Sequence, residues 1–121
     1  MNKKILLIDD EPEFVELVKL RLEANRYDVV TALDGKEGLE KAASERPDLI
    51  LLDITMPQKD GVEVLSQLQR EERTRRIPVI MLTAKSDTRS VFNAQELGAR
   101  DYLIKPFSPA ELLGLLERCL P

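Results

Sequence analysis

Residues 49–52 (LILL) form an uninterrupted apolar run that ends in a single carboxylate, Asp53. The run does not alternate between apolar and polar residues, so a strand built from it must be buried on both faces. Pro57 follows closely and prevents the strand from continuing, because proline has no backbone N–H to give to a sheet. Such a strand is typical of the centre of a parallel sheet that helices cover on both sides.

Similar short runs recur along the chain and alternate with apolar residues at helical spacing. The expected strands are residues 3–8, 27–32, 48–53, 78–83 and 101–104. The expected apolar helix faces are Phe14, Leu17, Val18 and Leu22; Gly38, Leu39, Ala42 and Ala43; Val62, Leu65, Leu68 and Gln69; Val91, Phe92, Ala94, Gln95 and Leu97; and Leu112, Leu116, Cys119 and Leu120. Five strand–helix repeats predict right-handed crossovers and an α/β fold with helices on both faces of a parallel sheet.

Helix-capping residues agree with this pattern. Ser108 is followed three residues later by Glu111, which is the spacing of a capping box. Asp34 and Asp60 are expected to cap the second and third helices, and Gly98 is a natural stop for the fourth.

The composition narrows the class of protein. A chain of 121 residues suffices for one domain with a core and is too short for two. No apolar run is long enough to cross a membrane, and the first one meets Asp9 too early to be a signal peptide. The absence of histidine and the single Cys119 argue against a zinc site, a histidine-based triad and an internal disulfide. We therefore expect a cytoplasmic protein.

The charge distribution bears on possible partners. The net charge is −4, and the densest basic stretch, residues 70–76, also contains two glutamates. A solvated helix end and loop explain this stretch better than a nucleic-acid site does, so we expect no direct nucleic-acid binding.

Five polar side chains follow or end the expected strands. They are Asp9 and Asp10 after the first strand, Asp53 in the third, Thr83 in the fourth and Lys105 after the fifth. Each alone has an ordinary explanation as a cap, a turn residue, a strand threonine or a surface lysine. Because parallel strands end at the same edge of a sheet, however, all five converge there, which is where open α/β sheets bind ligands.

This set of groups indicates phosphoryl chemistry. Clustered carboxylates repel one another, and a hard divalent cation such as Mg²⁺ removes that repulsion. Lys105 adds a positive charge and Thr83 a hydroxyl donor, so that a phosphoryl group could be bound beside Asp53. We therefore expect the Asp53 carboxylate to be the nucleophile that forms an aspartyl phosphate.

Four stretches together resemble the response-regulator receiver domain of two-component signalling. They are residues 6–12 (LLIDDEP), 48–61 (DLILLDITMPQKDG), 79–84 (VIMLTA) and 98–107 (GARDYLIKPF). The resemblance covers essentially the whole chain, so we expect residues 1–121 to be a single receiver domain with no visible output domain. It implies a flavodoxin-like (β/α)5 fold with five parallel strands in the order 2-1-3-4-5.

The resemblance also implies roles for residues at the acidic edge. Asp53 would accept a phosphoryl group from a histidine kinase or a histidine phosphotransfer protein, with no separate substrate turned over. Asp10, Asp53 and the backbone carbonyl of Thr55 would bind Mg²⁺, and Asp9 would act mainly through water. The backbone amides of Thr55 and Ala84 would contact the phosphoryl group.

Further implied roles concern signalling. Lys105 and Thr83 would contact the phosphoryl group, and the Lys105–Pro106 peptide would be cis. Thr83 and Tyr102 would form a switch pair that changes the face made by the fourth helix, fifth strand and fifth helix. On the last helix, we expect Leu113 and Leu115 at the margins of the core stripe.

One departure concerns oligomeric state. Receiver domains that dimerise in the winged-helix transcription-factor manner carry an acidic pair before the tyrosine and an arginine within the last helix. Here Arg100 and Asp101 precede Tyr102, and nothing basic lies between Glu111 and Arg118. This departure puts that dimer mode in doubt, and we expect a monomer or a phosphorylation-dependent dimer.

Three rival interpretations remain. An aspartyl phosphatase would need a second aspartate two residues after the nucleophile, where Thr55 stands. An FMN-binding flavodoxin would need a first loop rich in Ser, Thr and Gly, whereas residues 9–13 (DDEPE) repel phosphate. A pseudo-receiver that acts only through protein contacts would not need the complete acidic set with Thr83 and Lys105. Phosphorylation by a small phosphodonor with Mg²⁺ separates all three.

Overall fold

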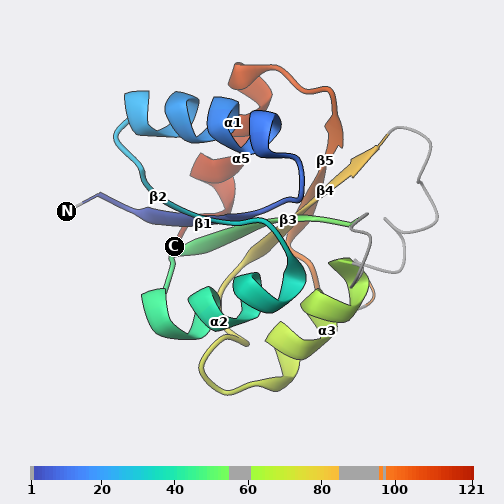
Figure 1. Cartoon of the computed structure of the whole chain (residues 1–121). Helices are drawn as coiled ribbons and strands as arrows, with labels where there is room; N and C mark the ends of the chain where they lie inside the picture. Colours follow the sequence, from blue (N-terminus) through green and yellow to red (C-terminus); the bar gives the residue numbers. More distant parts are fainter. Residues whose placement is uncertain (1, 55–60, 85–95, 97) are drawn as a thin grey trace.

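The computed structural model describes residues 2–54, 61–84, 96 and 98–121 (Figure 1). Within this part of the chain, five strands form one parallel sheet in the order β2-β1-β3-β4-β5. The elements are β1 (Lys4–Ile8), α1 (Pro12–Ala24), β2 (Asp28–Ala32), α2 (Gly35–Glu45), β3 (Leu49–Asp53), α3 (Gly61–Arg70), β4 (Val79–Ala84), β5 (Asp101–Lys105) and α5 (Pro109–Cys119). The expected fold class and strand order are confirmed.

Helices cover both faces of the sheet. Figure 1 shows α1 and α5 on one side and α2 and α3 on the other. Successive residues of β3 point alternately into two core clusters: Leu49 and Leu51 join the α1–α5 side, and Ile50 and Leu52 join the α2–α3 side. All five residues of β3 are buried, which accounts for the unbroken apolar run in the sequence.

The register brings the strand ends together. Ile8, the last residue of β1, pairs with both Ala32 and Leu52. Asp53 pairs with Leu82 of β4, and Ala84 pairs with Lys105 of β5. Residues far apart in the sequence therefore lie along one edge of the sheet.

The expected caps of α2 and α5 are confirmed. The Asp34 side chain accepts a hydrogen bond of 2.8 Å from the backbone N–H of Glu37. Ser108 and Glu111 form a reciprocal capping box at the start of α5. Gly98 has a φ of 101°, a conformation that glycine adopts readily. Asp60 and the helix expected around residues 91–97 lie outside the described residues, except Glu96.

Two expectations about helix faces are wrong. Leu17 is 63% exposed, and the buried stripe of α1 consists of Val15, Val18 and Leu22. Leu17 points about 100° away from Val18 because one helical residue turns by that angle. Leu115 is not at a margin: it is 3% exposed and joins the core stripe of α5. No helix among the described residues is long and apolar enough to cross a membrane.

Candidate functional site

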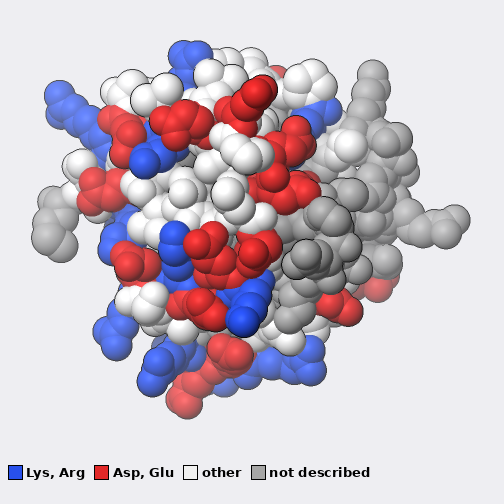
Figure 2. All heavy atoms as spheres, viewed as in Figure 1, with Lys and Arg blue, Asp and Glu red and all other residues white. Residues whose placement is uncertain are grey.

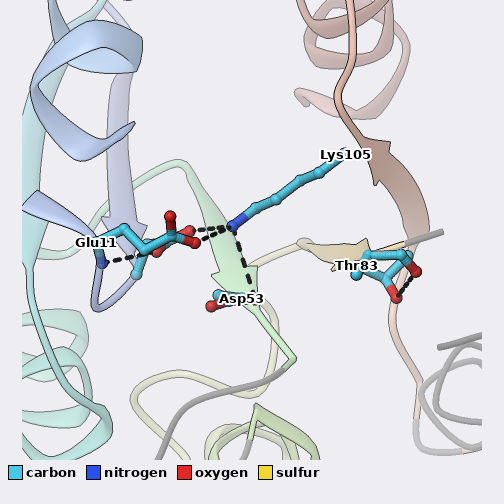
Figure 3. Close-up of polar contacts among 6 residues, drawn as sticks. Glu11, Asp53, Thr83 and Lys105 are labelled. Carbon is cyan, nitrogen blue, oxygen red and sulfur yellow. Dashed lines mark hydrogen bonds and ion pairs between the residues drawn. The ribbon is translucent and has the colours of Figure 1, made fainter. Parts of the chain in front are cut away.

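The carboxyl edge of the sheet brings three charged groups of the expected site into contact. Asp9 directly follows β1, Asp53 is the last residue of β3, and Lys105 is the last residue of β5. Figure 3 shows the Lys105 side chain reaching from β5 across the strand ends toward Asp53 and Glu11. Side chains separated by 96 residues in the sequence thereby become direct partners.

The Lys105 ammonium lies among three carboxylates. Its Nζ atom is 2.8 Å from Asp9 Oδ2, 3.6 Å from Glu11 Oε1 and 3.9 Å from Asp53 Oδ1. Asp9 is fully buried and Asp53 is 5% exposed. The other Asp9 oxygen accepts a 3.0 Å hydrogen bond from the backbone N–H of Glu11, which fixes the orientation of the carboxylate.

Burial has the largest influence on the pKa of Asp9. Its pKa lies above the ordinary value because loss of solvent disfavours the charged carboxylate, although Lys105 and the Glu11 N–H both act in the opposite direction. Burial alone would lower the pKa of Lys105, but the hydrogen bond to Asp9 and the charges of Asp53, Asp9 and Glu11 raise it overall. Lys105 therefore stays charged without fully offsetting the cost of the buried Asp9 carboxylate.

Asp9, Asp10 and Asp53 form an acidic cluster that fits a divalent cation. One carboxylate oxygen from each residue lies within 4.8 Å of the others, and Asp10 is more accessible than its two buried neighbours. Carboxylate oxygens are the ligands that Mg²⁺ prefers, and three of them from different residues gather within reach of one ion here. The donor set is therefore chemically suited to this metal.

Thr83 and the cis peptide occupy the positions expected from the sequence. Thr83 is buried near the end of β4, and its hydroxyl donates a 3.2 Å hydrogen bond to the Ala84 carbonyl (Figure 3). The Lys105–Pro106 peptide is cis. Thr55, expected to contribute a backbone carbonyl and amide, lies outside the described residues.

Sequence reasoning missed an aromatic contact at this edge. The Lys105 Nζ atom lies 4.2 Å from the centroid of the Phe14 ring, and that ring packs edge-on against Phe107. The helical spacing in the sequence predicts only a core role for Phe14. The available signal was its position one helical turn after Asp10, which places it beside the acidic edge if α1 begins there.

The comparison with protein families settles the class of the domain. A sequence model described as the response regulator receiver domain matches residues 5–117. The chain belongs to this family. A receiver domain is a signalling module of response regulators and not an enzyme that turns over a separate substrate.

Known proteins similar to this receiver domain support the assignment. The alkaline phosphatase synthesis transcriptional regulatory protein PhoP of Bacillus subtilis is 50% identical over 120 residues, which are 99% of this chain and 49% of PhoP. The receiver domain thus spans about half the length of the curated relatives it matches. Chemotaxis protein CheY4 of Vibrio cholerae has a structure with a TM-score of 0.93 at 33% identity, covering 99% of this chain and 100% of CheY4.

A further structural neighbour concerns the metal. The receiver domain of sensor histidine kinase PA1611 from Pseudomonas aeruginosa was solved with a magnesium ion coordinated in its active-site cleft. Its TM-score is 0.90 at 34% identity, with 98% of each chain covered.

The receiver domain also has a groove between its edge strand and last helix. The groove has a volume of about 260 Å³ and is lined by Tyr102 of β5 and by Gly114, Leu115 and Arg118 of α5, among others. Tyr102 pairs with Met81 and packs against the core cluster on the α2–α3 side. Tyr102 is thus positioned between the core and this groove.

Proposed function

We propose that this receiver domain accepts a phosphoryl group on Asp53 from the phosphohistidine of a histidine kinase or a histidine phosphotransfer protein. The observation that carries the proposal is the position of the nearly buried Asp53 carboxylate within the acidic cluster, with the Lys105 ammonium 3.9 Å from Oδ1. A carboxylate nucleophile with a fixed positive charge beside it suits phosphoryl transfer.

The proposed reaction is an in-line displacement. A carboxylate oxygen of Asp53 forms a bond to phosphorus as the phosphorus–nitrogen bond of the donor breaks, and the imidazole leaves with the electron pair and takes up a proton. Lys105 and the Thr83 hydroxyl stabilise the charge on the phosphoryl oxygens, joined by the backbone amides of Thr55 and Ala84. When the signal ends, water attacks the same phosphorus, the phosphorus–oxygen bond to Asp53 breaks, and inorganic phosphate leaves as the Asp53 carboxylate is regenerated.

Magnesium is the proposed cofactor. Asp10, Asp53 and the Thr55 carbonyl would hold it, with Asp9 acting mainly through water. When bound, the ion neutralises the carboxylates and the developing phosphoryl charge. The close approach of one carboxylate oxygen from each of the three aspartates supports this assignment.

Phosphorylation would be transmitted through Thr83 and Tyr102. In the proposed switch, the Thr83 hydroxyl moves to the phosphoryl group and the Tyr102 ring turns inward. This change alters the surface formed by β5, α5 and the helix expected around residues 91–97. Phosphorylation then favours a partner only if that partner binds the inward state more tightly. The groove beside Tyr102 supports this choice of surface.

The partners follow from this role. A histidine kinase or phosphotransfer protein supplies the phosphoryl group, and the output is delivered by another domain or protein. Figure 2 shows Lys and Arg side chains interspersed with Asp and Glu on the face it presents, and we propose that this domain does not itself contact nucleic acid. The single, buried Cys119 suits a reducing compartment, so we propose the cytoplasm as its location.

Intact mass measurement tests the proposal. The protein is incubated with acetyl phosphate and Mg²⁺, and we expect a gain of one phosphoryl group in the wild type and none in Asp53→Asn. Asp28→Asn, at the exposed first position of β2, is the matched control and should be modified like the wild type. An increase in mass by one phosphoryl group in Asp53→Asn, or no increase in the wild type, would overturn the assignment.

A further inference from the structure

Lys105 is held from two chemically different sides. Carboxylates of Asp9, Glu11 and Asp53 lie 2.8 to 3.9 Å from its ammonium, and the Phe14 ring, 4.2 Å away at its centroid, is a further neighbour. The Lys105 side chain is only 18% exposed. The ring therefore takes space beside the ammonium that water would otherwise fill.

The ring is itself fixed from two directions. Phe14 is anchored in the first turn of α1, which begins with Pro12, and it packs against the α1–α5 core cluster. Phe107, two residues after Lys105, meets it edge-on with centroids 5.9 Å apart and ring planes at 85°. A pair of aromatic rings in this arrangement is favourable and restricts the motion of both.

The face of an aromatic ring attracts an ammonium without carrying a net charge. A carboxylate binds Lys105 through full charge and competes with an incoming phosphoryl group for its N–H donors, whereas the ring supplies a weaker attraction over about 6 Å. Lys105 is closer to Asp9 than to Asp53. A shift on the order of 1 Å toward Asp53 would therefore leave the ammonium within range of the ring.

We infer that Phe14 is a positioning residue for Lys105: its ring keeps the ammonium beside Asp53 and out of solvent, and thereby accelerates phosphorylation of Asp53. This inference rests on the proposed function, in which Lys105 stabilises the phosphoryl group. Phe14 touches neither reacting atom, so its influence passes through Lys105 alone.

The competing explanation is that Phe14 merely fills space between α1 and α5. Its ring also lines a hollow of about 320 Å³ together with Leu17 and Phe107, so small changes of shape can be accommodated there. A space-filling role would be sensitive to volume, whereas a positioning role is sensitive to the aromatic ring and requires Lys105. Phe14→Leu, Phe14→Tyr and a Lys105→Ala background separate the two roles.

The experiment measures the rate of phosphorylation by acetyl phosphate at saturating Mg²⁺, together with the thermal midpoint and the Mg²⁺ affinity of each variant. We expect Phe14→Leu to slow phosphorylation roughly twofold to thirtyfold, the range given by the strength of a cation–π contact. Phe14→Tyr keeps an aromatic ring and should react at the wild-type rate. The Mg²⁺ affinity of Phe14→Leu and of Phe14→Tyr should equal that of the wild type. Leu17→Ala, on the same helix with an exposed side chain, is the control and should react like the wild type.

The double-mutant cycle decides the result. If Phe14 acts through Lys105, adding Phe14→Leu to Lys105→Ala causes no further loss. An equal loss in both backgrounds, or an unchanged rate in Phe14→Leu, overturns the inference and leaves the proposed function intact. Failure of the wild type to take up phosphoryl overturns the proposed function itself. Should Phe14→Leu not fold, Phe14→Met removes the ring while keeping more of the volume.

Discussion

At the scale of single residues, the acidic cluster combines a functional arrangement with a cost in stability. Asp9 and Asp53 are buried, and one carboxylate oxygen of each lies within 4.8 Å of one of Asp10, so the third carboxylate increases the repulsion. Such repulsion is felt most where burial limits solvent screening. Removing one charge should therefore stabilise the fold while weakening the proposed metal site.

We predict this behaviour for Asp10→Asn, which keeps the shape of the side chain. With a chelator present, the free energy of unfolding should rise by about 1 kcal/mol, because two like-charge contacts are removed from a partly screened cluster. Magnesium should stabilise the wild type through preferential binding to the folded state and should have much less effect on the variant. Urea unfolding with and without Mg²⁺ measures both; a lower stability of the variant in chelator would contradict the prediction.

At the scale of secondary-structure elements, two glycines occupy very different surroundings. A methyl group at Gly61, the first residue of α3, would collide with the Asp53 carbonyl oxygen and lie 2.6 Å from Ile54 Cα. A methyl group at Gly114 of α5 has no neighbouring atom within 4 Å. The close approach of α3 to the end of β3 thus depends on glycine at position 61 and sets the backbone that carries Asp53.

We predict opposite effects of alanine at these two positions. Gly61→Ala should lower the free energy of unfolding by about 3 kcal/mol and slow phosphorylation, because backbone atoms beside Asp53 must move. Gly114→Ala should raise the free energy of unfolding by about 0.5 to 1 kcal/mol, since alanine has a higher helix propensity than glycine at an exposed position within a helix. Urea midpoints of the two variants provide the measurement, and equal midpoints would show that α3 adjusts without cost.

The elements within the described residues, and the edge of the sheet to which Asp9, Asp53 and Lys105 belong, are predictable because their signals are local. The apolar run at 49–52 defines a doubly buried strand, and each parallel strand delivers its terminal residue to the same edge. Leu17 and Leu115 were misassigned because a periodicity of three and four leaves the phase of a helix face open by one residue. The contact between Phe14 and Lys105 depends on the relative placement of α1 and β5, which no local pattern encodes.

At the scale of the whole molecule, one sheet joins the proposed phosphorylation site to a distant surface. Asp53 and Thr83 lie on neighbouring strands β3 and β4, and β4 pairs with the edge strand β5, which carries Tyr102. The groove between β5 and α5 includes Gly114, whose open surroundings accept a large side chain. A substitution there can block a partner without disturbing the core.

We predict that a phosphoryl mimic such as beryllofluoride, with Mg²⁺, strengthens self-association of the wild type and not of Gly114→Arg. The added side chain occupies the groove beside Tyr102, whereas Gly114→Ala leaves it open and should behave like the wild type. Analytical ultracentrifugation over a concentration series measures the association. If the mimic strengthens association equally in Gly114→Arg, the signalling surface lies elsewhere.

The position of β5 at the edge of the sheet has a consequence for the chain as it leaves the ribosome. Asp9 emerges with the first strand and Asp53 with the third, whereas Lys105, whose ammonium pairs with both, emerges only with β5. Until it arrives, docking β1 beside β3 gathers the Asp9 and Asp53 carboxylates without the Lys105 ammonium. Repulsion between these carboxylates therefore disfavours early closure of the acidic edge in the nascent chain. When β5 joins the sheet, it adds the fifth strand and the Lys105 counterion together.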